Sequence, residues 1–268
     1  MNTDKPEKAT RRYSMAIIKG AAPIEEMRAL LKLWQPGDDA LTFQKHVAEI
    51  DIVGKQTARR ARDLVKEVFR PRLLTPDDRP ARWLKRYSEA GGENQLFKEA
   101  LFLYEARAEA VLYDFVLMEF WPACVSGTLT FGMDEVLDFL REAALSGRIE
   151  KPWSESNHRR VASAIMAALR GFGFLRGDKT GRREIVRYRV SDPMVAYLVH
   201  DLHFRDLPDA TVVEHPDWGL FGLDRDGTLD RLDALGPNAG LIVQRAGSVV
   251  RITWSHQSME SLIDALTR

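Results

Sequence analysis

The sequence predicts a mainly α-helical protein with a few short β-hairpins. Most of the 268 residues lie in segments whose apolar side chains recur every three or four positions, which is the spacing of one helix face. Only residues 172–190 and 239–254 show the alternation and turn residues of paired strands. With 45% apolar and 29% charged residues, the composition is typical of soluble, packed domains.

The N-terminal third predicts a small helical bundle. Residues 1–12 are polar and are expected to be a disordered tail, and residues 13–90 are expected to form the first domain. Within it, Tyr13–Lys19 suits a short extended arm, and Pro23–Leu33 an amphipathic helix that begins at a proline. A shorter helical run follows at Thr42–Ile50.

The next stretch, Val53–Arg72, indicates a cationic helix that follows a tight turn at residues 52–54. Two helices joined by a short glycine-containing turn, the second of them cationic, describe a helix-turn-helix unit. Its exposed side chains would contact the phosphates or bases of DNA. A solvated charged helix of an ordinary helical domain is the equal alternative. The candidate DNA contacts are Lys55, Gln56, Thr57, Arg59, Arg60, Arg62 and Lys66.

Residues 91–205 are expected to form a helical scaffold that carries a second basic unit. The broad apolar surface of 94–119 predicts one long helix or two, and Met133–Leu145 predicts another. The helix Ser154–Arg170 begins with a plausible N-cap serine. A basic hairpin follows, with strands at 172–176 and 184–190.

A helix followed by a basic hairpin is the sequence outline of a winged helix. Its wing tip would lie at residues 178–183. The helix would contact DNA through its first two turns, and the wing would neutralise the phosphate backbone. The candidate contacts in this unit are Asn157, Arg159, Arg160, Lys179, Arg182 and Arg183.

The last segment, residues 206–268, predicts a helix, a β-hairpin and a final helix. Arg225–Leu235 is the first of these helices and Ser258–Leu266 the last, with a hairpin around Ala246-Gly247 between them. The carboxylates of 206–236 are expected to form a solvated face or a surface for a basic partner.

The net charge of zero conceals an alternation of basic and acidic blocks. Residues 54–90 hold 11 Lys or Arg against 5 Asp or Glu, and residues 147–190 hold 11 against 4. Residues 92–146 and 191–240 each hold 3 against 10. Segregation of this kind creates local fields that the total charge does not reveal.

Signatures of catalysis are missing from the sequence. It contains no Walker A pattern, no GxSxG and no paired CxxC, so we expect a non-enzymatic protein with no catalytic residue, cofactor or small-molecule substrate. His200 and His203 have helical spacing, but no further ligand is evident and no metal site is expected. The single cysteine, Cys124, suits the cytoplasm, and no apolar run approaches the roughly 20 residues of a membrane span.

Three segments carry a family resemblance that extends over essentially the whole chain. They are RRYSMAIIKGAAPIEEMRALL, QTARRARDLVKEVFRPRL and, most specifically, HPDWGLFGLDRDGTLDRLDALGPNAGLIVQRAGSVVRITWSHQSMESLIDAL. With these segments the chain resembles the BrxA family of BREX phage-defence systems. The resemblance implies a mainly helical, non-enzymatic, cytosolic protein whose middle is similar to the NusB antitermination factor. It also implies binding of double-stranded DNA within a multi-subunit defence complex.

The leading expectation is therefore a double-stranded DNA-binding accessory protein of a BREX-type system, with other BREX subunits as partners. The alternative is a protein–protein adaptor that does not bind DNA directly. In that case the basic blocks would pair internally with the acidic ones. The acidic face and the aromatic residues Trp218, Phe221 and Trp254 would then hold partner subunits.

Overall fold

Helices make up most of the protein, which confirms the mainly α-helical prediction. The computed structural model describes residues 11–49, 58–177, 181–247 and 249–268. The α-helices, in chain order, are α1 (Ile24–Leu33), α2 (Ala40–Glu49), α3 (Ala58–Leu64), α4 (Arg70–Leu73), α5 (Arg79–Glu89), α6 (Asn94–Ala108), α7 (Ala110–Phe115), α8 (Trp121–Val125), α9 (Met133–Leu145), α10 (Glu155–Phe172), α11 (Asp192–His203), α12 (Asp209–Val213), α13 (Arg225–Leu235) and α14 (Met259–Leu266).

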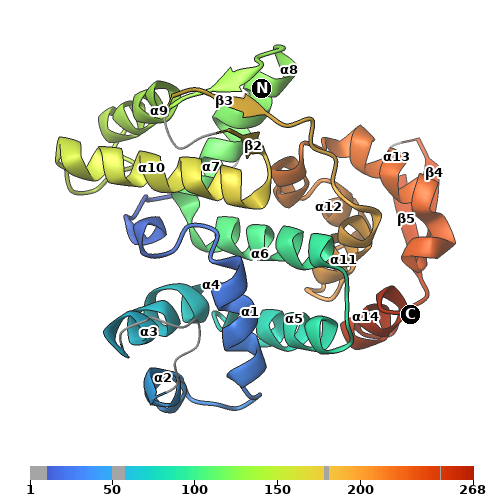
Figure 1. The fold of residues 1–268 in the computed structure, drawn as a ribbon. Coiled ribbons are helices and arrows are strands. Elements are labelled where there is room, and N and C mark those ends of the chain that lie inside the picture. The colour runs from blue at the N-terminus through green and yellow to red at the C-terminus, as the bar shows by residue number, and fades with distance from the viewer. Residues whose placement is uncertain (1–10, 50–57, 178–180, 248) are drawn as a thin grey trace.

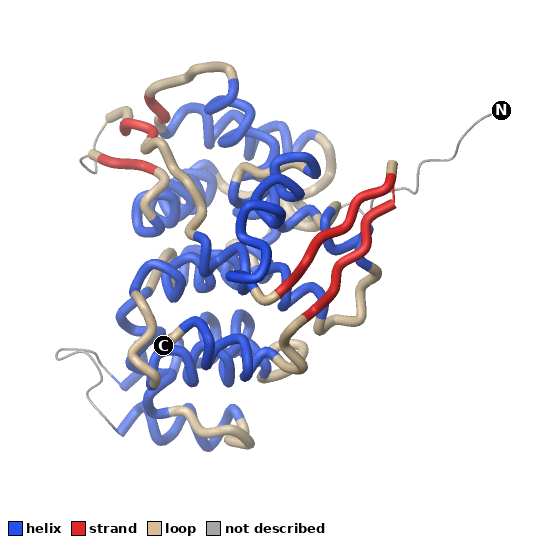
Figure 2. Tube along the Cα trace, turned by 90° about the vertical axis from the view of Figure 1, so that its right-hand side faces the viewer, coloured by secondary structure: helices blue, strands red, loops and turns tan. Residues whose placement is uncertain are grey.

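Short strands and tighter or wider helical turns complete the described chain. The 3-10 turns are η1 (Ala16–Lys19), η4 (Pro216–Phe221) and η5 (Gly236–Ala239), and the π-helical turns are η2 (Val65–Phe69) and η3 (Val116–Phe120). The strands are β1 (Thr130–Phe131), β2 (Leu175–Arg176), β3 (Arg183–Ile185), β4 (Leu241–Ala246) and β5 (Val249–Trp254). Figure 2 shows the small β1-β3-β2 sheet and the long β4–β5 hairpin on opposite sides of the molecule.

Helix α6 is the centre of the fold. It crosses the middle of Figure 1, with α10 on one side and α1 and α5 on the other, and it also contacts α4, α7 and α11. Ten of its 15 residues are buried, including Phe97, Phe102 and Tyr104. A helix covered on all sides needs no polar face, which explains the broad apolar surface in its sequence. The predicted long segment is two helices, because the backbone leaves helical geometry at Glu109.

Two proline residues explain the two π-helical turns. Pro71 follows the turn Val65–Phe69, and Pro122 follows the turn Val116–Phe120, in each case two residues after its end. A proline within a helix has no N–H to donate, and its ring clashes with the carbonyl one turn earlier. The wider turn relieves that conflict and adds a residue, which rotates the following side chains about the helix axis. After the first of these turns, Arg72 points into the core.

Several predicted boundaries differ from the structure. The expected extended arm at Tyr13–Lys19 contains the 3-10 turn η1, and the strands expected at 172–176 and 184–190 are only two and three residues long. The cationic helix is described from Ala58 onward. The predicted turn at residues 52–54 and the first ten residues of the predicted tail lie outside the described residues. Arg12, at the end of that tail, forms an ion pair of 2.8 Å with Glu150.

Hydrophobic contacts run across the domain limits expected at residues 90/91 and 205/206. Buried apolar side chains of the described residues form one cluster that extends from Tyr13 to Ile263. The ring of Tyr13 stacks on Phe139 of α9 with centroids 5.8 Å apart, and α14 packs on α5. The first and last segments thus bury their apolar faces against the scaffold, and this fixes the positions of the basic elements relative to one another.

Candidate nucleic-acid interface

The basic hairpin and the helices before it form a compact unit. The chain passes from β1 through α9 and α10 to β2 and β3, and β3 lies between the other two strands of the antiparallel sheet. Thr130 pairs with Glu184, and Leu175 pairs with Ile185. This connectivity is consistent with the predicted winged-helix unit. Strand β1 was not predicted, because a strand of two residues is too short to show alternation in the sequence.

Helix α10 is held firmly at both ends. The Ser154 hydroxyl accepts a hydrogen bond from the backbone N–H of Asn157, as the predicted N-cap requires. At the other end Gly173 adopts a left-handed conformation with φ of 91°, and its N–H bonds back to the last turn. Val161, Ile165 and other apolar residues of the inner face are buried. The rigid ends and buried inner face hold the outer face at a fixed orientation.

The outer face of α10 carries a cationic stripe. Ser156, Arg159, Arg160, Ser163 and Arg170 are all exposed, and their spacing places them along one side of the helix. Arg159 forms only an exposed ion pair with Glu155, and such pairs contribute little. Within the described part of the chain, Arg160 and Arg170 have no ion-pair partner. The stripe therefore presents guanidinium groups to solvent.

Arg182 and Arg183 at the wing have roles in holding the sheet. Arg182 forms an ion pair with Glu135 of α9 and donates to the Thr130 carbonyl oxygen at 2.9 Å. Arg183 was expected to face DNA, but its side chain is only 7% exposed and donates to the Met166 carbonyl oxygen at 2.6 Å. Burial, and then the charge of Arg170, lower its pKa. Side chains alternate along a strand, so Arg183 points inward and Glu184 outward.

The predicted helix-turn-helix residues are only partly described. Lys55, Gln56 and Thr57, like Lys179 of the wing, lie outside the described residues. Arg59, Arg60, Arg62 and Lys66 are exposed on α3 and η2. Helices α2 and α3 pack together as expected, and Phe43 lies 5.4 Å from Phe69 between ring centroids.

These four cations differ in what they contact. The Arg60 guanidinium donates to the Lys19 carbonyl oxygen at 2.9 Å, and the Arg62 carbonyl oxygen accepts from the Gln44 amide at 3.0 Å. Lys66 pairs with its neighbour Glu67 at 3.2 Å. The backbone and side-chain contacts tie α3 to α2 and η1, but they leave the cations at the surface.

The histidine pair and two of the aromatic residues named from the sequence take part in packing within the protein. His200 is buried with its Nδ1 2.8 Å from the Ala196 carbonyl oxygen, and His203 stacks on Trp254. The described residues contain no group of three or more His, Cys, Asp or Glu side chains placed to hold a metal ion. Trp218 and Phe221, expected on a docking surface, are buried in the core, so they are not available to a partner.

Ser163 and Arg170 were not among the DNA contacts predicted from the sequence. Both are separated from Arg159 by helical intervals, so extending the face by steps of three and four residues would have found them. Among the helices of the described residues, none is both long enough and apolar enough to cross a membrane.

Comparisons with known proteins agree with the family resemblance. A family model described as BrxA matches residues 11–201. The fold is similar to the crystal structure of an uncharacterized protein from Magnetospirillum magneticum, with a TM-score of 0.60 and 18% identity. That alignment covers 78% of this chain and 98% of the other. No curated protein matches the chain.

Proposed function

We propose that this chain, which belongs to the BrxA family and is thus a component of a BREX phage-defence system, is a non-enzymatic accessory protein that binds double-stranded DNA. The observation that carries the proposal is the cationic stripe on α10, at the outer surface of a unit with winged-helix connectivity. In helix-turn-helix proteins the second helix enters the major groove and positions its exposed side chains there. Other BREX subunits are the proposed protein partners.

The composition of the stripe suits a phosphate backbone. Its three arginines supply planar forks that fit phosphate oxygens, and the two serines supply short hydrogen-bond donors. Glu155 is the one acidic residue in the first turn. If Arg159, Arg160 and Arg170 each neutralise one phosphate, the slope of log affinity against log salt is about −2.7, and the affinity falls roughly 40-fold between 50 and 200 mM salt.

A fluorescence-anisotropy titration with a random-sequence duplex at these two salt concentrations tests the proposal. The native chain should bind more weakly at the higher salt, and Arg159→Ala/Arg160→Ala should bind more weakly than the native chain with a shallower salt slope. The matched control is Arg251→Ala/Arg268→Ala, which removes two exposed positive charges outside the α10 unit, one on β5 and one after α14. It should bind as the native chain does.

The same assay discriminates between the two basic surfaces. A loss of affinity in Arg59→Ala/Arg60→Ala, with none in the α10 variant, would move the site to α3. Equal losses in the control and in the α10 variant would show that the duplex responds to total charge only. No binding at either salt would refute the proposal.

A protein–protein adaptor without direct DNA contact remains the second candidate. Val125, the last residue of α8, and Leu129, just before β1, are 88% and 79% exposed, and apolar side chains of such exposure favour a protein contact. This candidate predicts that Val125→Ser/Leu129→Ser releases a BREX subunit that co-purifies with the native chain. Unchanged co-purification would exclude that surface.

A further inference from the structure

A cationic cavity lies between α4, α5, α6 and the segment 204–217. Its volume is about 720 Å³, which falls within the roughly 300–1,000 Å³ of small-molecule pockets. The side chains around it include seven Lys or Arg against two Asp. The site has no local sequence signature, because its walls come from segments as far apart as Arg11 and Asp217.

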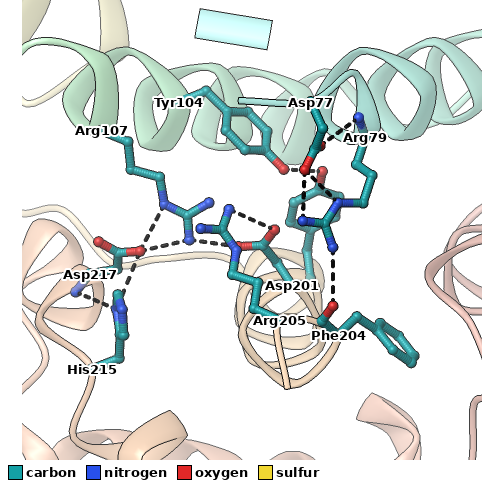
Figure 3. Close-up of polar contacts among 10 residues, drawn as sticks. Asp77, Arg79, Tyr104, Arg107, Asp201, Phe204, Arg205, His215 and Asp217 are labelled. Carbon is teal, nitrogen blue, oxygen red and sulfur yellow. Dashed lines mark hydrogen bonds and ion pairs between the residues drawn. The ribbon is translucent and has the colours of Figure 1, made fainter. Parts of the chain in front are cut away.

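Arg107 forms one end of the cavity floor and is held by two buried carboxylates. Its Nε donates to Asp217 at 2.8 Å and its Nη2 donates to Asp201 at 2.6 Å (Figure 3). Burial alone would raise the pKa of Asp217, but Arg107 and His215 hold it below its ordinary value. Arg107 is therefore a fixed cation whose side chain is 15% exposed.

Few carboxylates lie around the cavity floor, and they already have cationic partners. Asp201 serves two guanidinium groups, because Arg205 also pairs with it at 3.3 Å (Figure 3). Asp77 pairs with Arg79, which also donates to the Phe204 carbonyl oxygen at 3.2 Å. The carboxylates near the cavity are thus already engaged.

Further cations meet the same cavity from α4 and η2. Among the described residues, Arg70 has no ion-pair partner, and Lys66 pairs only with the half-buried Glu67. Arg11 lies over the ring of Tyr113 at 4.0 Å. In addition, Nη1 of Arg107 and Nε of Arg72 are buried without a hydrogen-bond acceptor in the described structure. Like charges that face one recess are unfavourable unless an anion lies between them.

We propose that this cavity binds a small ligand bearing a di- or triphosphate group, with Lys66, Arg70, Arg79 and Arg205 around the phosphates and Arg107 beneath them. Several cations spread around one recess match an anion with several charges and many oxygen atoms better than a single carboxylate. A DNA duplex is too wide to enter a recess between helices. The ligand is bound and not transformed, so the site is compatible with a protein that has no substrate.

Isothermal titration calorimetry with ATP, pyrophosphate and inorganic phosphate on the full chain tests this proposal. Saturable 1:1 binding of ATP or pyrophosphate is expected. Tighter binding of ATP indicates a nucleotide, whereas equal affinities indicate a bare polyphosphate. Lys66→Ala/Arg70→Ala removes two exposed cations and should weaken binding roughly 100-fold, at about a factor of ten for each lost charged contact.

Two controls keep the test separate from DNA binding. Arg159→Ala/Arg160→Ala and Arg251→Ala/Arg268→Ala should bind ATP and pyrophosphate as the native chain does. Absence of saturable binding, or unchanged binding in Lys66→Ala/Arg70→Ala, would overturn the proposal. An equal affinity for inorganic phosphate would also overturn the proposal, because it would show that the cavity binds an adventitious ion only. Loss of duplex affinity in Lys66→Ala/Arg70→Ala, without polyphosphate binding by the native chain, would assign these cations to DNA instead.

Discussion

Replacement of Arg72 by methionine should destabilise the protein strongly and in a pH-dependent way. The Arg72 side chain is buried on α4, and its Nη1 lies 2.7 Å from Glu105 and its Nη2 3.5 Å from Glu109. Both carboxylates are buried as well. Methionine keeps an unbranched apolar stem but leaves two buried acids without their cation. Loss of one partner of a buried ion pair costs about 3–5 kcal/mol, which lowers the melting temperature by roughly 10 °C in a chain of this size.

The pH dependence follows from the two glutamates. Burial raises the pKa of Glu105 to about 7, although Arg72 opposes the shift, and burial also raises the pKa of Glu109. A carboxyl whose folded pKa lies above its unfolded value favours the folded state most at low pH. That stability is lost as the pH rises through the folded pKa. Without Arg72 both pKa values rise further, so the variant should lose more stability at pH 8 than at pH 5.

Urea unfolding followed by circular dichroism at these two pH values measures the effect. Arg86→Met is the matched control, because its ion pair with Asp264 is exposed, and it should unfold with the native chain. A loss smaller than about 1 kcal/mol at pH 8, well below the range for a broken buried pair, would contradict this argument. An equal loss at both pH values would show that packing, and not charge, is responsible.

Three further changes test other parts of the fold. Ser154→Ala should cost about 1 kcal/mol in unfolding free energy, because it removes the N-cap of α10; an unchanged melting curve would contradict this. Burial, with the charges of His256 and His203, lowers the pKa of His200 to about 4. The free energy of unfolding of the native chain should therefore fall by up to about 3 kcal/mol as the pH falls from 6.5 to 4. In thermal unfolding over the same pH range, the melting temperature of His200→Gln should depend less on pH. Gly92→Ala should cost roughly 1–3 kcal/mol, because its Cβ would lie 2.3 Å from the buried Tyr87 ring; an unchanged melting temperature would show that the ring can move.

The sequence predicts elements better than it predicts their partners. Helices with a one-sided apolar stripe, such as Met133–Leu145, have the expected bounds because local periodicity determines them. Strand lengths were overestimated, since a wing needs only a few ladder pairs and the alternation continues beyond them. Arg183 was misplaced for a related reason, because the side of the sheet that faces α10 depends on packing.

The cationic cavity could not be predicted from the sequence. Arg107 belongs to an acidic block of the sequence, and nothing near it indicates a binding site. Its partners Asp201 and Asp217 follow some 100 residues later and reach it only when α11 and η4 pack beside α6. Contacts of such long range leave no local pattern, whereas the α10 stripe leaves one with helical period.

The paired and unpaired cations together decide how a neutral protein can bind DNA. Folding neutralises part of each basic block with acids from other segments, and the pairs include Arg72 with Glu105, Arg86 with Asp264, Arg148 with Asp114, and Arg182 with Glu135. Most of the stripe on α10 is not neutralised in this way, since among the described residues only its first arginine, Arg159, forms an ion pair. A positive field that is confined to this stripe implies few phosphate contacts and a modest affinity for DNA. A measured salt slope near −2.7 would match the stripe alone, and a much steeper slope would require the cations of α3 to reach the same duplex.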